Sequence, residues 1–252
     1  MKIAIITGAS SGLGREFVEQ LDARLNVDEF WVIARRNDRL LALRDSVKTK
    51  IVPISLDLIK KEDVEKYKEL LAASAPNVVA LVNAAGYGRI GLAENLSVTE
   101  QSEMIDLNVR ALTDVTLLTL PYMQKGARVW QIASLSSYMP LPYLSVYAAT
   151  KAYVLSFSRS LARELKPRGI RIMAVCPGWM RTEFLDRAAD APDALAHYGC
   201  FYVPSKVVKR ALRDMERGRG VSLYGTQTRL LIVLSKLLPH KWVAAIWYRL
   251  QA

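Results

Sequence analysis

Tyr147 and Lys151 are the side chains in this sequence whose types and spacing most directly suggest chemistry. Residues at positions i and i+4 share one face of a helix, so the phenol and the ammonium would lie close together. A free tyrosine has a pKa of about 10, which suits it poorly to proton transfer near neutral pH, and a neighbouring cation lowers that pKa by favouring the tyrosinate. The pair therefore suits a general acid that protonates the oxygen of a carbonyl group as it becomes an alcohol.

The same spacing occurs again at Tyr202 and Lys206, so the pair by itself is weak evidence. Pro204 lies between these two residues and argues against a continuous helix there. Tyr147, by contrast, follows an apolar run at 128–133 that is typical of a strand. We therefore prefer Tyr147 and Lys151 as the reactive pair.

A glycine-rich turn follows the first apolar run of the chain, residues 3–6. Glycines at such a turn permit a tight bend, a close approach of backbone to a diphosphate, and close packing of the next helix on the strand. That helix directs free N–H groups and its positive dipole end at the phosphates. A merely tight turn is the alternative, but the order strand, loop, helix favours a dinucleotide site. The residues predicted to line this site are Gly8, Ser10, Ser11, Gly12, Leu13 and Gly14.

The residues after the second apolar run, 30–34, bear on which dinucleotide binds. An acidic residue at this place binds the ribose 2′-hydroxyl of NAD, and a basic residue accommodates the 2′-phosphate of NADP. The chain has Ala34, Arg35 and Arg36 there and no carboxylate. Arg35 is placed for a charge-assisted contact with a phosphate, and Arg36 for a supporting contact or for stacking on adenine. A solvated basic turn is the alternative, and NADP(H) is the predicted cofactor.

Short apolar runs alternate with longer amphipathic segments, and these elements must position the residues above. Strands are predicted at 3–6, 30–34, 51–55, 78–82, 128–133, 170–175 and 220–224. Helices are predicted near 13–25, 38–47, 61–73, 99–123 and 145–165. This alternation, with strands apolar on both sides, predicts an α/β fold: one doubly wound (Rossmann) domain with about seven parallel strands and helices on both faces.

The turn from Thr7 to Gly14 has the spacing TGxxxGxG, and with the pair Tyr147 and Lys151 it resembles the short-chain dehydrogenase/reductase family over about residues 1–225. The resemblance implies that Lys151 also bonds the nicotinamide ribose. It implies that Ser134, thirteen residues before Tyr147, bonds the substrate oxygen. Two other serines lie close enough to compete for that role, Ser136 and Ser137.

The resemblance also implies that Asn108 holds a water linking Lys151 to solvent, although Asn108 taken alone fits a polar helix interior equally well. The family often has two asparagines after the fourth strand, where this chain has Val82 and Asn83. Asp57 is both a candidate adenine contact and a candidate N-cap for a helix beginning near residue 60. The further cofactor-binding residues that the resemblance implies are Asp57, Leu58, Asn83, Ala84, Pro177, Gly178 and Thr182.

Residues 1–225 are expected to form the catalytic domain, with a substrate lid at about 183–219. Apolar lid residues such as Phe184 and Tyr198 fit either a hydrophobic substrate or a helix that covers the core. The segment 226–252 mixes apolar residues with cations and contains Pro239, so it is too charged and too broken to span a membrane. It is predicted to pack on the domain, to form an oligomer interface or to form a hydrophobic wall of the pocket, with peripheral contact to a membrane surface as the less favoured alternative.

The net charge of +11 is concentrated late in the chain, because ten basic and two acidic residues lie between Lys206 and Ala252. No nucleic-acid recognition motif accompanies them, so no nucleic-acid partner is expected. Two cysteines without CxxC spacing and two separated histidines argue against a disulfide framework and against a metal site. The first apolar run is too short for a signal peptide, so a cytoplasmic location is expected, with the membrane periphery as the alternative.

Together these features predict an NADP(H)-dependent oxidoreductase that moves a hydride between nicotinamide and the carbonyl or alcohol carbon of a lipophilic small molecule, and that works as a homo-oligomer. The alternative is a non-enzymatic NADP(H)-binding regulator or scaffold on the same fold. The presence of all four candidate catalytic residues favours the enzyme, because a regulator need not keep them. Those residues are Asn108, Ser134, Tyr147 and Lys151.

Overall fold

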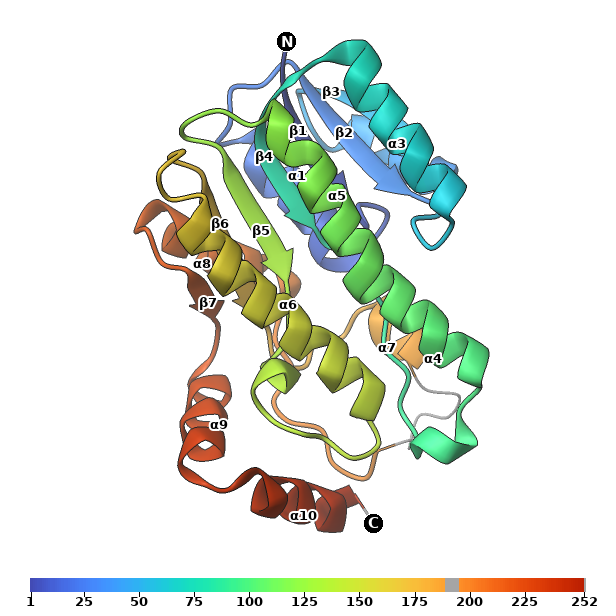
Figure 1. Cartoon of the computed structure of the whole chain (residues 1–252), viewed down its shortest axis with the longest axis vertical. Coiled ribbons are helices and arrows are strands. Elements are labelled where there is room, and N and C mark those ends of the chain that lie inside the picture. Colours follow the sequence, from blue (N-terminus) through green and yellow to red (C-terminus); the bar gives the residue numbers. More distant parts are fainter. Residues whose placement is uncertain (189–194, 252) are drawn as a thin grey trace.

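The protein is built on one sheet of seven parallel strands, and the computed structural model describes residues 1–188 and 195–251. The strands are β1 Lys2–Thr7, β2 Glu29–Ala34, β3 Lys50–Ser55, β4 Asn77–Asn83, β5 Arg128–Ile132, β6 Arg171–Cys176 and β7 Val221–Leu223. Their order across the sheet is β3-β2-β1-β4-β5-β6-β7 (Figure 1). The predicted α/β fold with a parallel sheet is confirmed.

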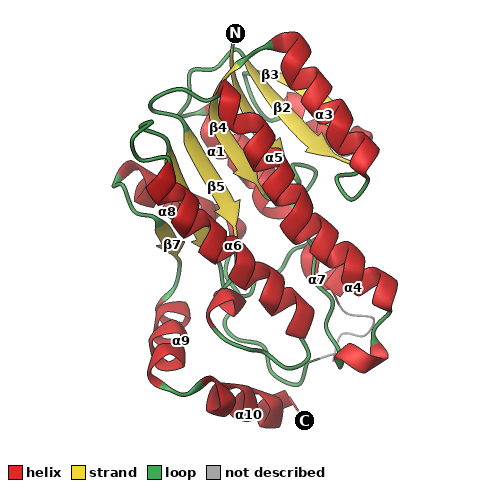
Figure 2. Cartoon of the chain, in the orientation of Figure 1, coloured by secondary structure: helices red, strands yellow, loops and turns green. Residues whose placement is uncertain are grey.

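Helices cover both faces of the sheet because each strand directs apolar side chains to either side. In β1, Ala4 and Ile6 face the layer of α1 Gly12–Asp22, α2 Asn37–Leu41 and α8 Pro204–Glu216. Ile3 and Ile5 face the layer of α3 Lys61–Ser74, α5 Leu112–Thr119 and α6 Ser145–Glu164. Figure 2 shows the strands between these two helical layers.

The carboxyl ends of the central strands form the edge at which a ligand is expected. β1 lies between β2 and β4, so the strand order reverses beside it, and such sheets open into a crevice at that point. The Thr7 hydroxyl, at the end of β1, accepts hydrogen bonds of 3.1 Å from the backbone N–H groups of both Ala84 and Ala85. These bonds hold the loop after β4 against the glycine turn.

The helix predicted over 99–123 is interrupted at its centre. A π-helical segment, Asp106–Ala111, joins α4 Val98–Ile105 to α5 without a turn. A π segment holds an extra residue per turn and therefore changes the face on which the following side chains lie. Asn108 lies in this segment and is fully buried. The helix predicted over 38–47 is also shorter, since α2 ends at Leu41 and a 3-10 turn follows.

The range predicted as a lid, 183–219, divides into parts with different surroundings. α7 Glu183–Ala188 lies over the edge of the sheet, whereas residues 189–194 lie outside the described residues. α8 packs against α1 and the sheet through Val207, Ala211 and Leu212, so the second half of the range is a core helix. The predicted lid is therefore too long.

Two helices, α9 Thr226–Leu237 and α10 His240–Gln251, follow β7 and lie at the end of the molecule opposite Met1 (Figure 1). They account for the predicted extension over 226–252, of which residue 252 lies outside the described residues. Across the described ranges, no helix combines the length and apolar character that crossing a membrane requires.

Candidate active site

The turn after β1 leaves no room for a side chain at two of its glycines. Gly8 has a φ of +67°, where other residues are strained, and a Cβ there would lie 2.6 Å from the backbone nitrogen of Ala85. A Cβ on Gly14 would collide with the carbonyl oxygen of Gly8. The first turn of α1 therefore packs directly on the end of β1, as the glycine spacing predicts.

The first turn of α1 presents backbone N–H groups toward this edge of the sheet. Ser11 is the N-cap, but its side chain makes no capping hydrogen bond, and the first turn contains no acidic residue. The positive end of the helix dipole is therefore not neutralised by a carboxylate within the helix. With Gly8 and Gly14 closing the floor, this cradle fits the diphosphate of a dinucleotide.

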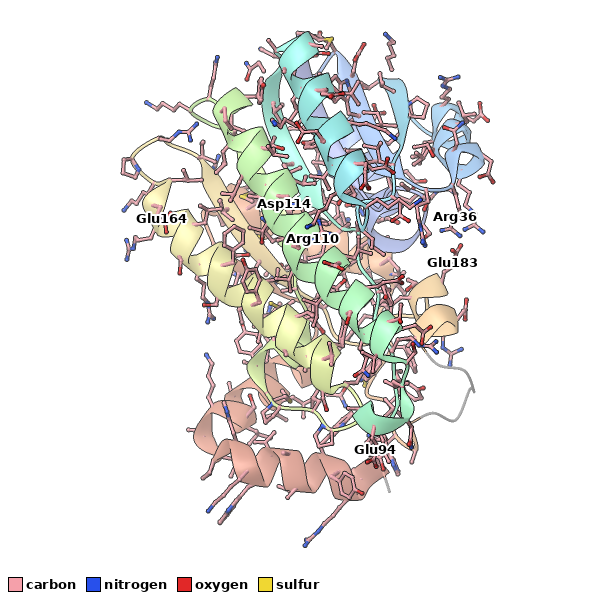
Figure 3. All side chains as sticks on the ribbon, turned by 45° about the vertical axis from the view of Figure 1, so that its right-hand side comes forward. Arg36, Glu94, Arg110, Asp114, Glu164 and Glu183 are labelled. Atoms are coloured by element: carbon pink, nitrogen blue, oxygen red, sulfur yellow. The ribbon has the colours of Figure 1, made fainter. Side chains whose placement is uncertain are left out.

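Arginines after β2 flank the same turn. The guanidinium of Arg36 donates to the hydroxyls of Ser10 and Ser11 at 3.1 and 3.3 Å. It also forms an ion pair of 2.8 Å with Glu183 of α7 (Figure 3). Arg39 pairs with the other carboxylate oxygen of Glu183, and these two hydrogen bonds lower the pKa of the Glu183 carboxyl. Two cations thus converge on one half-exposed carboxylate beside the phosphate cradle.

A cavity of about 700 Å³ extends from the glycine turn to the first turn of α6. Its lining includes nearly all of the predicted site residues: Gly8, Ser10, Ser11, Gly12, Leu13, Gly14, Arg35, Arg36, Asp57, Leu58, Ala84, Ser134, Tyr147, Lys151, Pro177, Gly178 and Thr182. Asn83 and Asn108 do not line it. Beyond Tyr147 the wall becomes apolar, with Met139, Leu141, Leu144, Phe184, Leu185 and Trp247.

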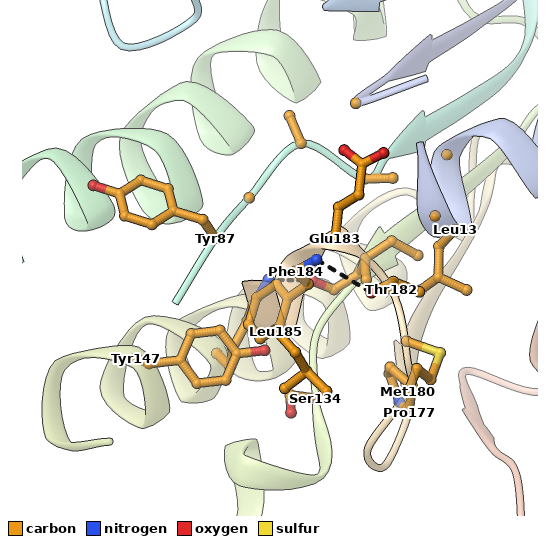
Figure 4. A pocket seen from close by; sticks show the side chains of 18 of the residues that line it. Leu13, Tyr87, Ser134, Tyr147, Pro177, Met180, Thr182, Glu183, Phe184 and Leu185 are labelled. Carbon is orange, nitrogen blue, oxygen red and sulfur yellow. Dashed lines mark hydrogen bonds between the residues drawn. The ribbon is translucent and has the colours of Figure 1, made fainter. Parts of the chain in front are cut away.

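Ser134, Tyr147 and Lys151 meet in this cavity. Helix α6 presents Tyr147 and Lys151 on one face, and the Lys151 Nζ atom lies 5.7 Å from the centre of the Tyr147 ring. Ser134 follows β5, and its hydroxyl lies near enough to the Tyr147 phenol to act on the pKa of Tyr147; Figure 4 shows both side chains at the cavity. Lys151 Nζ also donates to the carbonyl oxygen of Ile132 at 2.8 Å. A phenol, a hydroxyl and an ammonium are therefore gathered at one place.

Burial changes the proton affinity of both α6 groups. Desolvation raises the pKa of Tyr147 to about 12, although the hydrogen bond with Ser134 acts in the opposite direction. Desolvation lowers the pKa of Lys151 to about 8. The sequence predicts that the ammonium of Lys151 lowers the pKa of Tyr147. In the folded protein the effect of burial on this pKa is larger, so the pKa rises. Tyr147 is therefore an acid that keeps its proton near neutral pH.

The three serines after β5 have different surroundings. Ser134 is the N-cap of the 3-10 turn Leu135–Tyr138, and its hydroxyl accepts a hydrogen bond from the Ser136 N–H. The hydroxyl of Ser137 is buried and donates to the carbonyl oxygen of Lys151 at 2.8 Å. Ser137 therefore fixes the start of α6, and Ser134 is the serine of this group whose hydroxyl contacts Tyr147.

Asn108 holds the backbone beside the cavity instead of facing it. Its side-chain amide donates to the Tyr87 carbonyl at 2.8 Å and accepts from the Tyr87 N–H at 3.1 Å. A Cβ on Gly86 would lie 2.8 Å from the Asn108 oxygen and 3.4 Å from Lys151 Nζ. The π segment thus brings Asn108 next to the loop after β4 and close to Lys151.

Two predicted cofactor residues, Asn83 and Asp57, have different surroundings. The Asn83 side chain donates to Thr116 and Gln131, both at 2.9 Å, in the protein interior. The alternation along β4 directs this side chain under the helices, so the cofactor contact of Asn83 stays a prediction for its backbone. Asp57 does line the cavity, whereas the N-cap of α3 is Lys60, so the alternative role of Asp57 as that cap is wrong.

Several residues around the cavity were not predicted. Thr7 belongs to the glycine turn and Gly86 to the segment after the fourth strand. Both positions could therefore have been identified from these motifs. Arg39 and Glu183 are 144 residues apart, and no pattern in the sequence connects them. Trp247 of the last helix also lines the cavity, and for this residue the sequence did offer a hydrophobic pocket wall as one alternative for the tail.

Known proteins resemble the chain in sequence. A family model described as short chain dehydrogenase matches residues 2–193. A Pinus massoniana protein named 11-beta-hydroxysteroid dehydrogenase is 32% identical over 188 residues. That match covers 72% of this chain and 52% of the pine protein, so the chain spans about half the length of this relative.

Solved structures resemble it in fold. A short-chain dehydrogenase from Sphingobium yanoikuyae in complex with NADPH has a TM-score of 0.79 and 27% identity, with 94% of each chain covered. A short-chain dehydrogenase/reductase from Burkholderia phymatum in complex with NAD has a TM-score of 0.78 at 20% identity, with 96% of this chain and 94% of that chain covered. With its glycine turn and its Tyr147–Lys151 pair on one cavity, the chain belongs to the short-chain dehydrogenase/reductase family of oxidoreductases.

Proposed function

We propose that the protein is an NADP(H)-dependent oxidoreductase that reduces a lipophilic carbonyl compound, or oxidises the corresponding alcohol, with Tyr147 as the general acid or base. The observation that carries this proposal is the meeting of Ser134, Tyr147 and Lys151 in the cavity that begins at the glycine turn. Proton transfer needs these groups within hydrogen-bonding reach of one reacting oxygen.

The preference for NADP(H) rests on charge. Arg35 and Arg36 follow β2 and line the cavity. Position 34, at the end of β2, holds alanine and not an acidic residue. Arg36 donates to the hydroxyls of Ser10 and Ser11 in the phosphate cradle, and this position of its guanidinium supports binding of a ribose 2′-phosphate. The Sphingobium relative is a complex with NADPH, which is consistent with this preference.

In the proposed reaction the cofactor supplies or accepts the hydride when it is bound. Ser134 donates a hydrogen bond to the substrate oxygen, and Tyr147 gives that oxygen its proton during reduction. Because burial raises the pKa of Tyr147 to about 12, the phenol is protonated and ready to donate at neutral pH. Lys151 binds the nicotinamide ribose, and its ammonium favours the tyrosinate that remains.

Return of a proton to Tyr147 is proposed to pass by way of Lys151 and the region of Asn108. The pKa of Lys151, lowered to about 8 by burial, allows this ammonium to release a proton near neutral pH. Asn108 fixes the Tyr87 backbone beside Gly86, close to Lys151 Nζ. In this scheme Asn108 is a positioning residue that acts through Lys151.

The proposed substrate class follows from the far end of the cavity. Its wall beyond Tyr147 is formed by aliphatic and aromatic side chains, among them Leu144, Phe184 and Trp247. Such a wall favours an apolar body, while Ser134 and Tyr147 supply the polar contacts that orient one oxygen. The pine relative is named for a steroid substrate, which belongs to the same lipophilic class.

The test is to follow NADPH absorbance with a panel of lipophilic ketones and aldehydes. Tyr147→Phe should bind NADPH as the unmodified protein does and lose roughly 10²–10⁴-fold in kcat. Tyr202→Phe is a matched control, because Tyr202 also precedes a lysine by four residues yet does not line the cavity, and it should keep its activity. Undiminished turnover in Tyr147→Phe contradicts the mechanism, and NADPH binding without turnover of any carbonyl favours a regulator.

A further inference from the structure

Helix α9 has its apolar face turned outward. Its buried positions carry two polar side chains and one apolar one, whereas the leucine-rich positions of the opposite face lie in solvent. The outward positions are spaced i, i+3, i+4 and i+7, which is the pattern of one helix face. They are Leu230, Val233, Leu234 and Leu237, which are 58, 53, 43 and 75% exposed. The inward positions are Thr228, Ile232 and Ser235, which are at most 4% exposed.

Helix α10 also carries exposed apolar side chains. Trp242, Ile246 and Leu250 follow one another at intervals of four, and each is at least half exposed. The other side of α10 holds the helix on the protein, because the Trp247 indole donates to the Pro142 carbonyl at 2.9 Å and Tyr248 stacks on Tyr143. We call the exposed apolar residues of α9 and α10 the tail face. Large exposed apolar side chains gathered on two successive helices mark a site of contact with a partner.

The charge of this region is of one sign. No acidic residue occurs from Thr226 to the end of the sequence, whereas Arg229, Lys236, Lys241 and Arg249 are exposed in it. Among the described residues, no ion pair involves any of these four cations. Lys236 lies over the ring of Tyr138 at 5.6 Å, which leaves its charge in place.

These observations distinguish two occupants. A second copy of the chain joined through the same surface would bring eight cations together without a carboxylate in either tail, which opposes association. An anionic bilayer instead offers phosphate groups at the level of the cations and acyl chains for the leucines and Trp242. We propose that the tail face docks on the surface of an anionic membrane.

This docking would bring the cavity next to lipid. Leu231 of α9 and Trp247 of α10 line the cavity that also contains Tyr147. A lipophilic substrate dissolved in the bilayer would then reach Tyr147 past the same helices that hold the protein there. This second step rests on the proposed function, whereas the docking itself does not.

The experiment is co-sedimentation of the full chain with vesicles of phosphatidylglycerol and, separately, of phosphatidylcholine. The protein should sediment with phosphatidylglycerol vesicles, less with phosphatidylcholine vesicles, and less as salt screens the cations. Replacing Leu230, Val233 and Leu237 together by serine should lower the partition coefficient at least about tenfold. The matched control replaces Leu70, Val98 and Leu117, exposed on α3, α4 and α5, by serine and should bind as the unmodified protein does.

The charge is tested in the same assay. Lys241→Glu combined with Arg249→Glu should weaken binding roughly tenfold or more, since each cation near an anionic surface contributes to attraction. Arg163→Glu combined with Lys166→Glu changes charge equally at the far end of α6 and should leave binding unchanged.

Three results would overturn the docking proposal: equal sedimentation with both lipids, no sedimentation with phosphatidylglycerol, or serine variants that bind as the unmodified protein does. A dimer in sedimentation velocity that dissociates in the serine variant would assign the surface to a second copy. NADPH affinity and turnover of a water-soluble carbonyl, measured without vesicles, should be unchanged in all tail variants. Loss of the proposed function is therefore distinguishable from loss of docking.

Discussion

Helices α1 and α9 both begin at a glycine-containing turn after a strand, yet they bury opposite kinds of side chain. α1 buries Phe17, Val18 and Leu21 and directs charged residues such as Arg15 outward. α9 buries Thr228 and Ser235 and exposes its leucines, as described above.

The difference teaches that an amphipathic pattern identifies an apolar face but not its partner. For α1 the partner is the sheet of the same chain, which fixes the glycine turn and the cofactor cradle. Helix α9 also has an apolar face, but that face points away from the protein. The first helix therefore serves the internal chemistry, and the second is available to something outside the chain.

The sharpest test of the α1 region is Gly14→Ala. The new Cβ would collide with the Gly8 carbonyl, so the helix start must move away from β1 and the cradle is lost. We expect NADPH affinity to fall by roughly a thousandfold in fluorescence titration. Gly220→Ala, before β7, has nothing within 4 Å of its new Cβ and should leave affinity unchanged. Similar affinities in the two variants would remove the basis for the cradle.

A matched pair of truncations compares the two helices directly. Phe17→Ala removes a fully buried ring that packs on Trp130, and we expect it to lower the free energy of unfolding by about 3–5 kcal/mol. Leu237→Ala removes a side chain that is mostly in solvent and should change it by less than about 0.5 kcal/mol. Urea denaturation measures both. A large loss in Leu237→Ala would mean that α9 packs more tightly than described.

The cofactor end of the α1 region is tested by Ala34→Asp. A carboxylate at the end of β2 binds the ribose 2′-hydroxyl of NADH and repels the 2′-phosphate of NADPH. We expect kcat/KM to shift toward NADH by roughly 10–100-fold, as for loss of a charge-assisted contact. Initial rates with each cofactor give the ratio. If the unmodified protein uses both cofactors equally, the predicted NADP(H) preference is wrong.

A buried cation and an exposed one provide a contrast in pH dependence. Burial lowers the pKa of Lys151 to about 8, so its ammonium is present below that pH and is lost above it. Since reduction needs a proton returned to Tyr147, kcat should be steady below about pH 8 and fall up to tenfold per unit above it. The pH–rate profile at saturating NADPH measures this. Lys241→Ala should not change the profile, and a flat profile through this range would contradict the proposed role of Lys151.

The smallest expected effect concerns Glu183. Its two arginine partners contrast with the cations of the tail, which form no ion pair within the part of the chain that the structure describes. Glu183→Gln removes a half-exposed carboxylate beside the cradle and frees Arg36 and Arg39 for an incoming phosphate. Exposed ion pairs contribute at most about 1 kcal/mol, so NADPH should bind up to roughly fivefold more tightly. Isothermal titration detects this change, and weaker binding would show that Glu183 supports the cofactor site.

The sequence was sufficient to predict the parallel sheet, the glycine cradle and the Tyr147–Lys151 face because each depends on local geometry. Each of these features has a sequence pattern that spans only a few residues. The patterns are a strand apolar on both sides, a turn rich in glycine and a spacing of i, i+4. The order of the strands then brings the glycine turn and the Tyr147–Lys151 pair to the same edge of the sheet.

The remaining features depend on contacts between distant parts of the chain. The π segment around Asn108 has no local signature, so the helix over 99–123 was predicted as regular. The side chain of Asn83 bonds inward because of partners on α5 and β5. The outward face of α9 was beyond prediction for the same reason, since its pattern is equally compatible with burial.

The position of Trp247 has a practical consequence for work with this protein. This side chain forms part of the cavity wall and is held to Pro142, whereas Met1 lies at the opposite end of the molecule (Figure 1). A purification tag fused after residue 251 would lie beside the apolar part of the cavity wall, and one fused before Met1 would not. Protein carrying its tag at the amino end is therefore the suitable reagent for measuring KM with bulky carbonyls.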